Sequence, residues 1–167
     1  MSYQEHQHLS PKSISCAVIV ISDSRTEEND ESGKFIIQTL KENGHRVTSY
    51  CLLKNDADSI YQTLDEFLYE NDLQVIITSG GTGVSQRDVT IETVLPTLDK
   101  KMDGFGELFR SLTYREIKTG SIMSRAMAGV SRGKVVICLP GSLGAVSLAM
   151  EQIILPEIGH MVREATR

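Results

Sequence analysis

Residues 13–22 (SISCAVIVIS) constrain the fold most, because this segment is apolar and β-branched on both of its alternating faces. A strand of this kind must be covered on both sides, as the strands of a parallel sheet are. Residues 46–53, 74–79 and 134–140 also have strand character. Segments with apolar residues at helical spacing alternate with these strands, which predicts an α/β fold with three layers, α/β/α, around a mostly parallel sheet.

Capping residues indicate where the helices begin and end. Residues 34–44 predict a helix that Gly44 ends, because glycine readily adopts the left-handed conformation that closes a helix. We expect Asp58 to cap the next helix, since such a side chain accepts hydrogen bonds from the first turn. Thr90 is expected to cap a third helix that continues to Leu98.

The segment from 102 to 131 contains FGELFRSL and SIMSRAMAG, and each of them predicts a helical piece. Its apolar side chains are more numerous than a connection needs, so they either fill the core or contact other subunits. Ser142 is expected to cap the last helix, which Pro156 either interrupts or restarts.

Length and charge limit the function classes. The chain has 167 residues and no repeat or linker, which predicts one domain over residues 13–167 behind a flexible polar tail, residues 1–12. Its net charge is −5 without a basic run, which weighs against nucleic acid, because binding to phosphate backbones needs clustered lysine and arginine. The longest apolar run, CAVIVI, is too short to span a membrane, and no signal peptide is evident, so we expect a cytoplasmic protein.

The cysteines and histidines lack metal-ligand spacing. The three cysteines lie in apolar runs without a CxxC motif, so we expect reduced thiols in the core: Cys16, Cys51 and Cys138. The histidines are expected at solvated or surface positions: His6, His8, His45 and His160.

Polar residues and glycines follow the carboxyl ends of the four predicted strands, where ligands bind in open α/β sheets. They are Ser22 and Asp23, then Asn55 and Asp56, then the glycine loop of residues 80–83, and finally Gly141 and Ser142. Glycine at positive φ can turn successive N–H groups toward an anion, and both glycine loops lead into helices, whose N-termini favour anions. On the glycines alone, a tight connection between strand and helix explains the glycine loop equally well.

Arg87 and Asp88 favour phosphate binding at the stretch TSGGTGVSQRDVT, residues 78–90. Arg87 can pair with a phosphate group. Asp88 would repel phosphate unless Mg²⁺ lies between them, since Mg²⁺ takes one or two carboxylates together with phosphate oxygens. The alternative for Asp88 is an acid at the start of a helix, and the alternative for Asp23 and Asp56 is a solvated turn.

The chain contains, in this order, the stretches ISDSR, TSGGTGVSQRDVT, GFGELFR, SRAMAG and LPGSLGAV. In sequence and spacing they resemble the molybdopterin-binding MoaB/MogA family of molybdenum cofactor biosynthesis, and the last two stretches look more like MoaB than MogA. The resemblance implies an α/β/α fold, assembly as a homotrimer or homohexamer, and molybdopterin and other molybdenum cofactor biosynthesis proteins as partners. Active members use Mg-ATP to adenylylate the molybdopterin phosphate and release pyrophosphate.

Carried over to this sequence, the resemblance implies that the glycine loop holds phosphate through Gly80, Gly81, Thr82 and Gly83. It implies that Asp88 is the essential acid, and that the pterin and nucleotide site is lined by Ser22, Asp23, Ser124, Gly141 and Ser142. Where the MogA pattern has an aspartate after the second strand, this chain has Asn55, with Asp56 next to it. Either Asp56 is the second catalytic and magnesium-binding acid, or adenylylation is weak and the protein mainly binds molybdopterin. A third hypothesis is nucleotide processing without pterin, as in the competence-damage family, which shares the fold.

Overall fold

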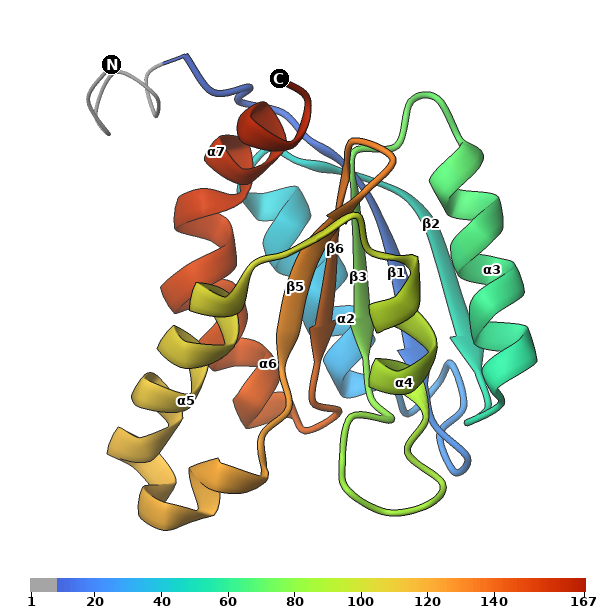
Figure 1. Cartoon of the computed structure of the whole chain (residues 1–167), viewed down its shortest axis with the longest axis vertical. Helices are drawn as coiled ribbons and strands as arrows, with labels where there is room; N and C mark the ends of the chain where they lie inside the picture. The colour runs from blue at the N-terminus through green and yellow to red at the C-terminus, as the bar shows by residue number, and fades with distance from the viewer. Residues whose placement is uncertain (1–8) are drawn as a thin grey trace.

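A sheet of six strands forms the centre of the molecule (Figure 1). The computed structural model describes residues 9–167, and its strands are β1 Ser15–Ile21, β2 Arg46–Leu53, β3 Val75–Ser79, β4 Lys100–Lys101, β5 Met127–Ser131 and β6 Lys134–Leu139. Their order in the sheet is β2-β1-β3-β6-β5-β4. β2, β1, β3 and β6 are parallel, and β5 is antiparallel to both of its neighbours, which confirms the mostly parallel sheet.

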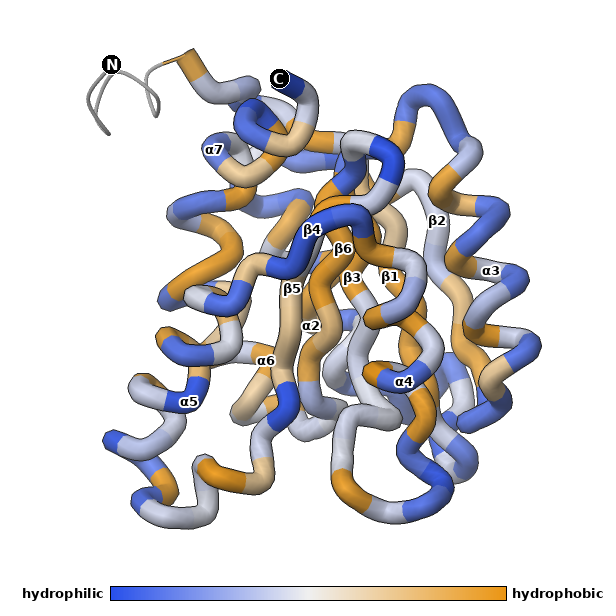
Figure 2. Tube along the Cα trace, in the orientation of Figure 1, coloured by the Kyte–Doolittle hydropathy of each residue, from blue (hydrophilic) through white to orange (hydrophobic). Residues whose placement is uncertain are grey.

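Helices cover both faces of this sheet and confirm the three layers. They are α2 Glu31–Glu42, α3 Ala57–Tyr69, α4 Thr90–Val94, α5 Asp103–Ile117, α6 Leu143–Ala149 and α7 Leu155–Ala165. Alternate side chains of β1 enter two separate cores: Val18 packs with α2, α5, α6 and α7, and Ile19 packs with α3 and α4. The hydrophobic positions accordingly follow the strands in Figure 2.

α2 begins earlier than predicted, at Glu31, because Asp30 caps it. The Asp30 carboxylate is fully buried, and it accepts a hydrogen bond of 3.0 Å from the N–H of Gly33 and one of 2.7 Å from the hydroxyl of Tyr50. The capping bond itself is local, and only the contact with Tyr50 of β2 is long-range. The predicted end is confirmed, since Gly44 follows α2 with a φ of 83°.

The caps of the next two helices differ from the prediction. Asp56, not Asp58, caps α3, and Asp58 already lies in its first turn. Thr90 is the first residue of α4, and Val89 occupies the cap position without a side-chain hydrogen bond. The hydroxyl of Thr90 instead donates to the carbonyl oxygen of Gly80 at 2.9 Å, so it fastens the glycine loop. α4 ends sooner than predicted and passes into a short 3₁₀ helix, η1 Leu95–Thr97.

The helix predicted over SIMSRAMAG is wrong, whereas the one over FGELFRSL lies within α5 and is confirmed. The 3₁₀ helix η2, Lys118–Met123, ends before β5 begins. β5 turns into β6 through Arg132 and Gly133, whose φ angles of 50° and 74° suit a two-residue hairpin. Pairing with β6 therefore outweighs the local helical pattern.

The C-terminal helices follow the prediction. Ser142 caps α6 by accepting a hydrogen bond from the N–H of Ala145. The chain continues through a π-helix, η3 Met150–Ile154, into α7, where Pro156 lies in the first turn and so restarts a helix.

The three thiols are free, and Cys16 and Cys138 are buried as predicted, while Cys51 is half-buried. Burial raises the pKa of Cys16 to about 12, of Cys51 to about 11 and of Cys138 to about 12. His45 and His160 are half-buried rather than at the surface. The two histidines of the N-terminal tail, His6 and His8, lie outside the described residues. No helix within residues 9–167 is long and apolar enough to span a bilayer.

Candidate functional site

The candidate site is a cavity of about 650 Å³ at the carboxyl ends of β1, β3 and β6, at the lower edge of the sheet in Figure 1. The loops after these strands form its polar side, and α5 and η2 form the opposite side. Most of the predicted site residues line it: Ser22, Asp23, Gly80, Gly81, Thr82, Gly83, Asp88, Ser124, Gly141 and Ser142. Asn55 also lines it, whereas Arg87 and Asp56 do not.

The loops after β1, β3 and β6 touch one another at glycines. Gly80 has a φ of 107°, and a Cβ on it would lie 2.0 Å from the carbonyl oxygen of Ile21. A Cβ on Gly141 would lie 3.3 Å from the Cα of Gly80. Glycine is therefore needed here for close approach as well as for backbone conformation.

The glycine loop has free hydrogen-bond donors. The N–H of Gly80 donates to Leu139 at 2.9 Å, but the N–H groups of residues 81–84 donate to no acceptor in the part of the chain that the structure describes. Successive free N–H groups in a glycine-rich turn form a concavity that attracts anions. The geometry therefore suits a phosphate group at this loop.

The carboxylate of Asp88 lies next to Gly83 of this loop. One carboxylate oxygen, Oδ2, accepts hydrogen bonds from the N–H and the hydroxyl of Ser85, at 3.1 and 2.7 Å. The other oxygen, Oδ1, has no hydrogen-bond donor among the described residues. A Cβ on Gly83 would lie 2.6 Å from Oδ2, so the glycine makes room for this carboxylate.

Arg87 lies outside the lining of the cavity and pairs with Asp23, which lines it. Its Nε and Nη2 donate to Asp23 Oδ2 at 3.1 and 2.8 Å, and the N–H of Asn55 donates to Asp23 Oδ1 at 3.0 Å. The backbone hydrogen bond from Asn55, with a smaller contribution from Arg87, lowers the pKa of Asp23. Asp23 thus ties the loops after β1, β2 and β3 together at the mouth of the cavity.

Asn55 and Asp56 have different surroundings. The Oδ1 atom of Asn55 is buried at the cavity and has no hydrogen-bond partner among the described residues; it lies 2.6 Å from the position of a Cβ on Gly81. Asp56 instead caps α3, accepting hydrogen bonds from the N–H and hydroxyl of Ser59 at 2.9 and 2.6 Å, which lower its pKa. The structure therefore brings Asn55, and not Asp56, together with Asp88.

The opposite wall of the cavity is largely apolar. It includes Phe109, Ile117 and Met123 from α5 and η2. The hydroxyl of Ser124, which follows Met123, is buried and has no hydrogen-bond partner within residues 9–167. The sequence prediction assigned this region to the core or to subunit contacts. The sequence signal that could have identified this wall is the spacing of Phe109, Thr113 and Ile117, which places all three on one side of a helix. A cavity with one apolar wall and one loop of free N–H donors suits a ligand that has both an apolar and an anionic part.

Two arginines that the sequence prediction missed hold the loops. Arg25 donates to the carbonyl oxygen of Gly141 at 2.7 Å and lies 3.6 Å from the buried carboxylate of Asp30. Arg125 donates to the carbonyl oxygens of Thr82 and Gly83. Both arginines occur in stretches that carried the family resemblance, ISDSR and SRAMAG, and their contacts cross the fold.

The protein oxygens at the cavity could hold a magnesium ion only together with phosphate oxygens of a bound molecule. Asp88 offers one free carboxylate oxygen and Asn55 one amide oxygen, and Mg²⁺ commonly adds phosphate oxygens to one or two protein ligands. Within residues 9–167, no group of three or more His, Cys, Asp or Glu side chains is placed to hold a metal on its own.

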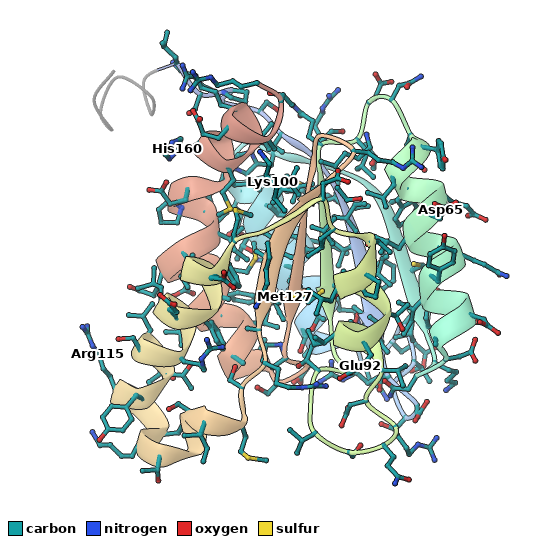
Figure 3. The ribbon with its side chains drawn as sticks, viewed as in Figure 1. Asp65, Glu92, Lys100, Arg115, Met127 and His160 are labelled. Atoms are coloured by element: carbon teal, nitrogen blue, oxygen red, sulfur yellow. The ribbon has the colours of Figure 1, made fainter. Side chains whose placement is uncertain are left out.

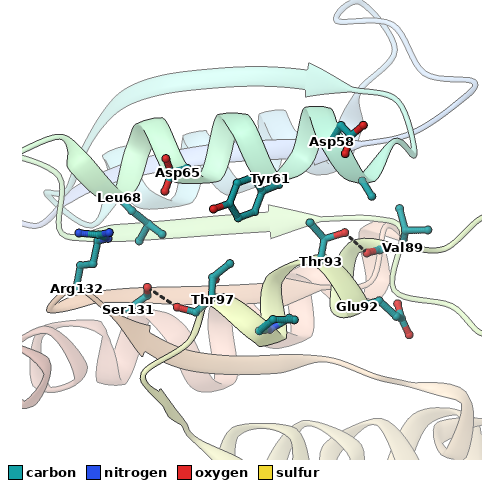
Figure 4. A pocket seen from close by; sticks show the side chains of 12 residues that line it. Asp58, Tyr61, Asp65, Leu68, Val89, Glu92, Thr93, Thr97, Ser131 and Arg132 are labelled. Atoms are coloured by element: carbon teal, nitrogen blue, oxygen red, sulfur yellow. Dashed lines mark hydrogen bonds between the residues drawn. The ribbon is translucent and has the colours of Figure 1, made fainter.

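A second cavity, of about 590 Å³, lies between α3 and α4 (Figure 4). Tyr61 and Asp65 of α3 face it, and Thr93 and Glu92 of α4 are among its other lining residues. It contains none of the predicted site residues.

Comparison with known proteins identifies the family. The family model described as "Probable molybdopterin binding domain" matches residues 17–160. Molybdenum cofactor biosynthesis protein B of Bacillus cereus is 49% identical over 168 residues, which cover 100% of this chain and 99% of that protein. A crystal structure of a molybdenum cofactor biosynthesis protein B is 49% identical with a TM-score of 0.89, over 93% of this chain and 98% of that chain.

MoaB of Pyrococcus furiosus, a tungsten cofactor synthesizing protein, is 34% identical with a TM-score of 0.86, over 95% of this chain and 100% of that chain. The similarity thus extends over the sheet, both helical layers and the loops of the cavity. The chain therefore belongs to the molybdopterin-binding MoaB/MogA family of molybdenum cofactor biosynthesis proteins and is of MoaB type.

Proposed function

We propose that this protein binds molybdopterin in the cavity at the carboxyl end of the sheet and adenylylates its terminal phosphate with Mg-ATP. One observation carries the proposal: the free N–H groups of the glycine loop and the free oxygen of Asp88 belong to the lining of one cavity. An anion site and a carboxylate are compatible neighbours when a divalent cation lies between them. Membership of the family supports molybdopterin as the ligand.

In the proposed reaction, a phosphate oxygen of molybdopterin attacks the α-phosphorus of ATP. A P–O bond forms as the bond between the α-phosphorus and the bridging oxygen breaks, and pyrophosphate leaves with that electron pair. The loop N–H groups orient the phosphates, and the exposed apolar side chains of Ile117 and Met123 orient the ring system. Mg²⁺ held by Asp88 would neutralise phosphate charge. Positioning and charge neutralisation supply most of the catalysis in such transfers, so no nucleophilic side chain is required.

A second candidate function is binding or carriage of molybdopterin with little catalysis. The position of Asn55 favours it, because the residue at the cavity is an amide and the neighbouring carboxylate of Asp56 caps a helix. An amide oxygen is a weaker magnesium ligand than a carboxylate.

One assay separates the two functions. Purified protein is incubated with molybdopterin and Mg-ATP, and adenylylated product and pyrophosphate are quantified; molybdopterin binding is measured in parallel without ATP. Formation of many moles of adenylylated molybdopterin per mole of protein supports the adenylyltransferase function. Binding without product supports the carrier, and turnover of ATP without molybdopterin would contradict both.

We also propose a closed homo-oligomer, a trimer or a hexamer of two trimers. The supporting observation is a set of exposed apolar side chains on α5 and η2: Leu108, Tyr114, Ile117, Ile122 and Met123. Exposed apolar patches commonly mark contacts between proteins. Other proteins of molybdenum cofactor biosynthesis are the remaining proposed partners.

A further inference from the structure

Arg125 lies just after η2, behind the glycine loop and outside the lining of the cavity. Its Nε donates to the carbonyl oxygen of Thr82 at 2.9 Å, and its Nη2 donates to that of Gly83 at 2.5 Å. The same guanidinium is paired with the carboxylate of Glu92 through both of its terminal nitrogens. Arg125 thus connects the glycine loop with the first turn of α4.

These contacts determine which way the peptide groups of the loop face. The carbonyl and the N–H of a trans peptide point in opposite directions, and no described peptide bond is cis. Because the Thr82 carbonyl points at Arg125, the N–H of Gly83 in the same peptide points away from Arg125. Gly83 lines the cavity and Arg125 does not, so the contact places this N–H on the side of the peptide opposite Arg125.

Glu92 keeps the guanidinium in place. Its side chain points away from α3 (Figure 4) and is 56% exposed, whereas the side chain of Arg125 is 30% exposed. Hydrogen bonding to Arg125 lowers the pKa of Glu92, so the contact favours the charged carboxylate. Arg125 uses three different nitrogens for the two carbonyls and the carboxylate, whereas the three donors of a lysine ammonium all start from one nitrogen and cannot reproduce this spread.

We propose that Arg125 is a positioning residue, which Glu92 anchors and which turns the N–H groups of the glycine loop toward a bound phosphate. The inference rests on the proposed function in one respect, namely that the loop holds phosphate. Arg125 touches neither substrate nor metal, and it acts through the two carbonyl groups that it holds.

The test uses inorganic pyrophosphate as the probe, with the full-length chain. Isothermal titration calorimetry measures its dissociation constant for the wild type, Arg125→Lys, Arg125→Gln and Glu92→Gln. Arg115→Gln is the matched control, because it removes an arginine charge from the exposed side of α5, away from the loop (Figure 3). A nitrogen–proton NMR spectrum follows the Gly83 amide during each titration.

We expect both Arg125 variants to weaken pyrophosphate binding about 10-fold, the loss that follows when one or two hydrogen bonds are misdirected. Arg125→Lys keeps the charge, so its failure to rescue binding distinguishes orientation from simple attraction. The shift of the Gly83 amide on binding should disappear in both variants. Glu92→Gln should weaken binding about 3-fold, and Arg115→Gln should leave it unchanged.

Wild-type affinity and an intact Gly83 shift in Arg125→Lys would overturn the positioning role while leaving the phosphate site standing. If the Arg125 variants do not fold, the test rests on Glu92→Gln, because a substitution at this exposed side chain should not prevent folding. Wild-type pyrophosphate affinity and an unchanged Gly83 resonance in Glu92→Gln would then refute the inference. If pyrophosphate neither binds the wild type nor shifts its Gly83 amide, the loop holds no phosphate, and the proposed function is refuted as well.

Discussion

Asp88→Asn is the most direct test of the proposed chemistry. The substitution is nearly isosteric, and the amide oxygen of asparagine can accept both hydrogen bonds that Ser85 now donates to Oδ2. The NH₂ group then takes the place of the free oxygen and presents a donor where a cation would bind. The local fold is therefore retained, while the negative charge and the metal ligand are lost.

The expected loss in adenylylation is at least ~100-fold, the usual effect of removing one preorganised charge contact. A 100-fold loss corresponds to about 2.7 kcal/mol of transition-state stabilisation. The free energy of unfolding should change by less than about 1 kcal/mol, because both hydrogen bonds to Ser85 can be re-formed. Molybdopterin affinity measured without metal should change little.

The assay quantifies adenylylated molybdopterin at saturating ATP over a range of magnesium concentrations. Ser85→Ala is the matched control, because it removes the hydroxyl contact to Asp88 and keeps the carboxylate. Asp88→Asn should need far more magnesium or remain inactive, whereas Ser85→Ala should retain most of its rate. Near-normal turnover of Asp88→Asn would refute the assignment of Asp88 as a metal ligand.

Four further predictions follow from the site and the surface. Asn55→Asp should raise the adenylylation rate by placing a carboxylate at the cavity. Asp56→Ala should lower the melting temperature through loss of the α3 cap and leave the rate unchanged. Loss of product in Asp56→Ala would show that Asp56 is a catalytic acid after all. Ser142→Asp should weaken ligand binding through repulsion without unfolding, since aspartate also caps helices, and equal dissociation constants would argue against an anion at this loop. Light scattering should give the mass of three or six chains, and the mass of a monomer, 18.5 kDa, would contradict the proposed assembly. A thiol reagent at pH 8 should react slowly with the folded protein and fully after denaturation, because burial keeps all three thiols protonated: Cys16, Cys51 and Cys138.

The sequence by itself determined the layers of the fold and the edge of the sheet where the site lies. Residues 13–22 are apolar on both faces, and only a strand covered on both sides buries such a segment, so β1 and its helical cover could be predicted locally. The glycines at 80, 81 and 83 predicted a tight turn at this edge, and the structure gives Gly80 and Gly81 the positive φ that favours glycine. The glycines alone left a plain strand-to-helix connection equally open, and only Arg87 and Asp88 pointed to a ligand.

Contacts between distant segments were decided only by the tertiary structure. The buried carboxylate of Asp30 gained the hydroxyl of Tyr50 as its distant partner, and Met127–Ser131 became a strand because β6 was available for pairing. Whether Asn55 or Asp56 faces the cavity depends on where α3 begins, a difference of one residue that periodicity cannot resolve. The role of Arg125 depends on carbonyl groups more than forty positions away, and a guanidinium carries no local signal of which distant acceptors it will meet.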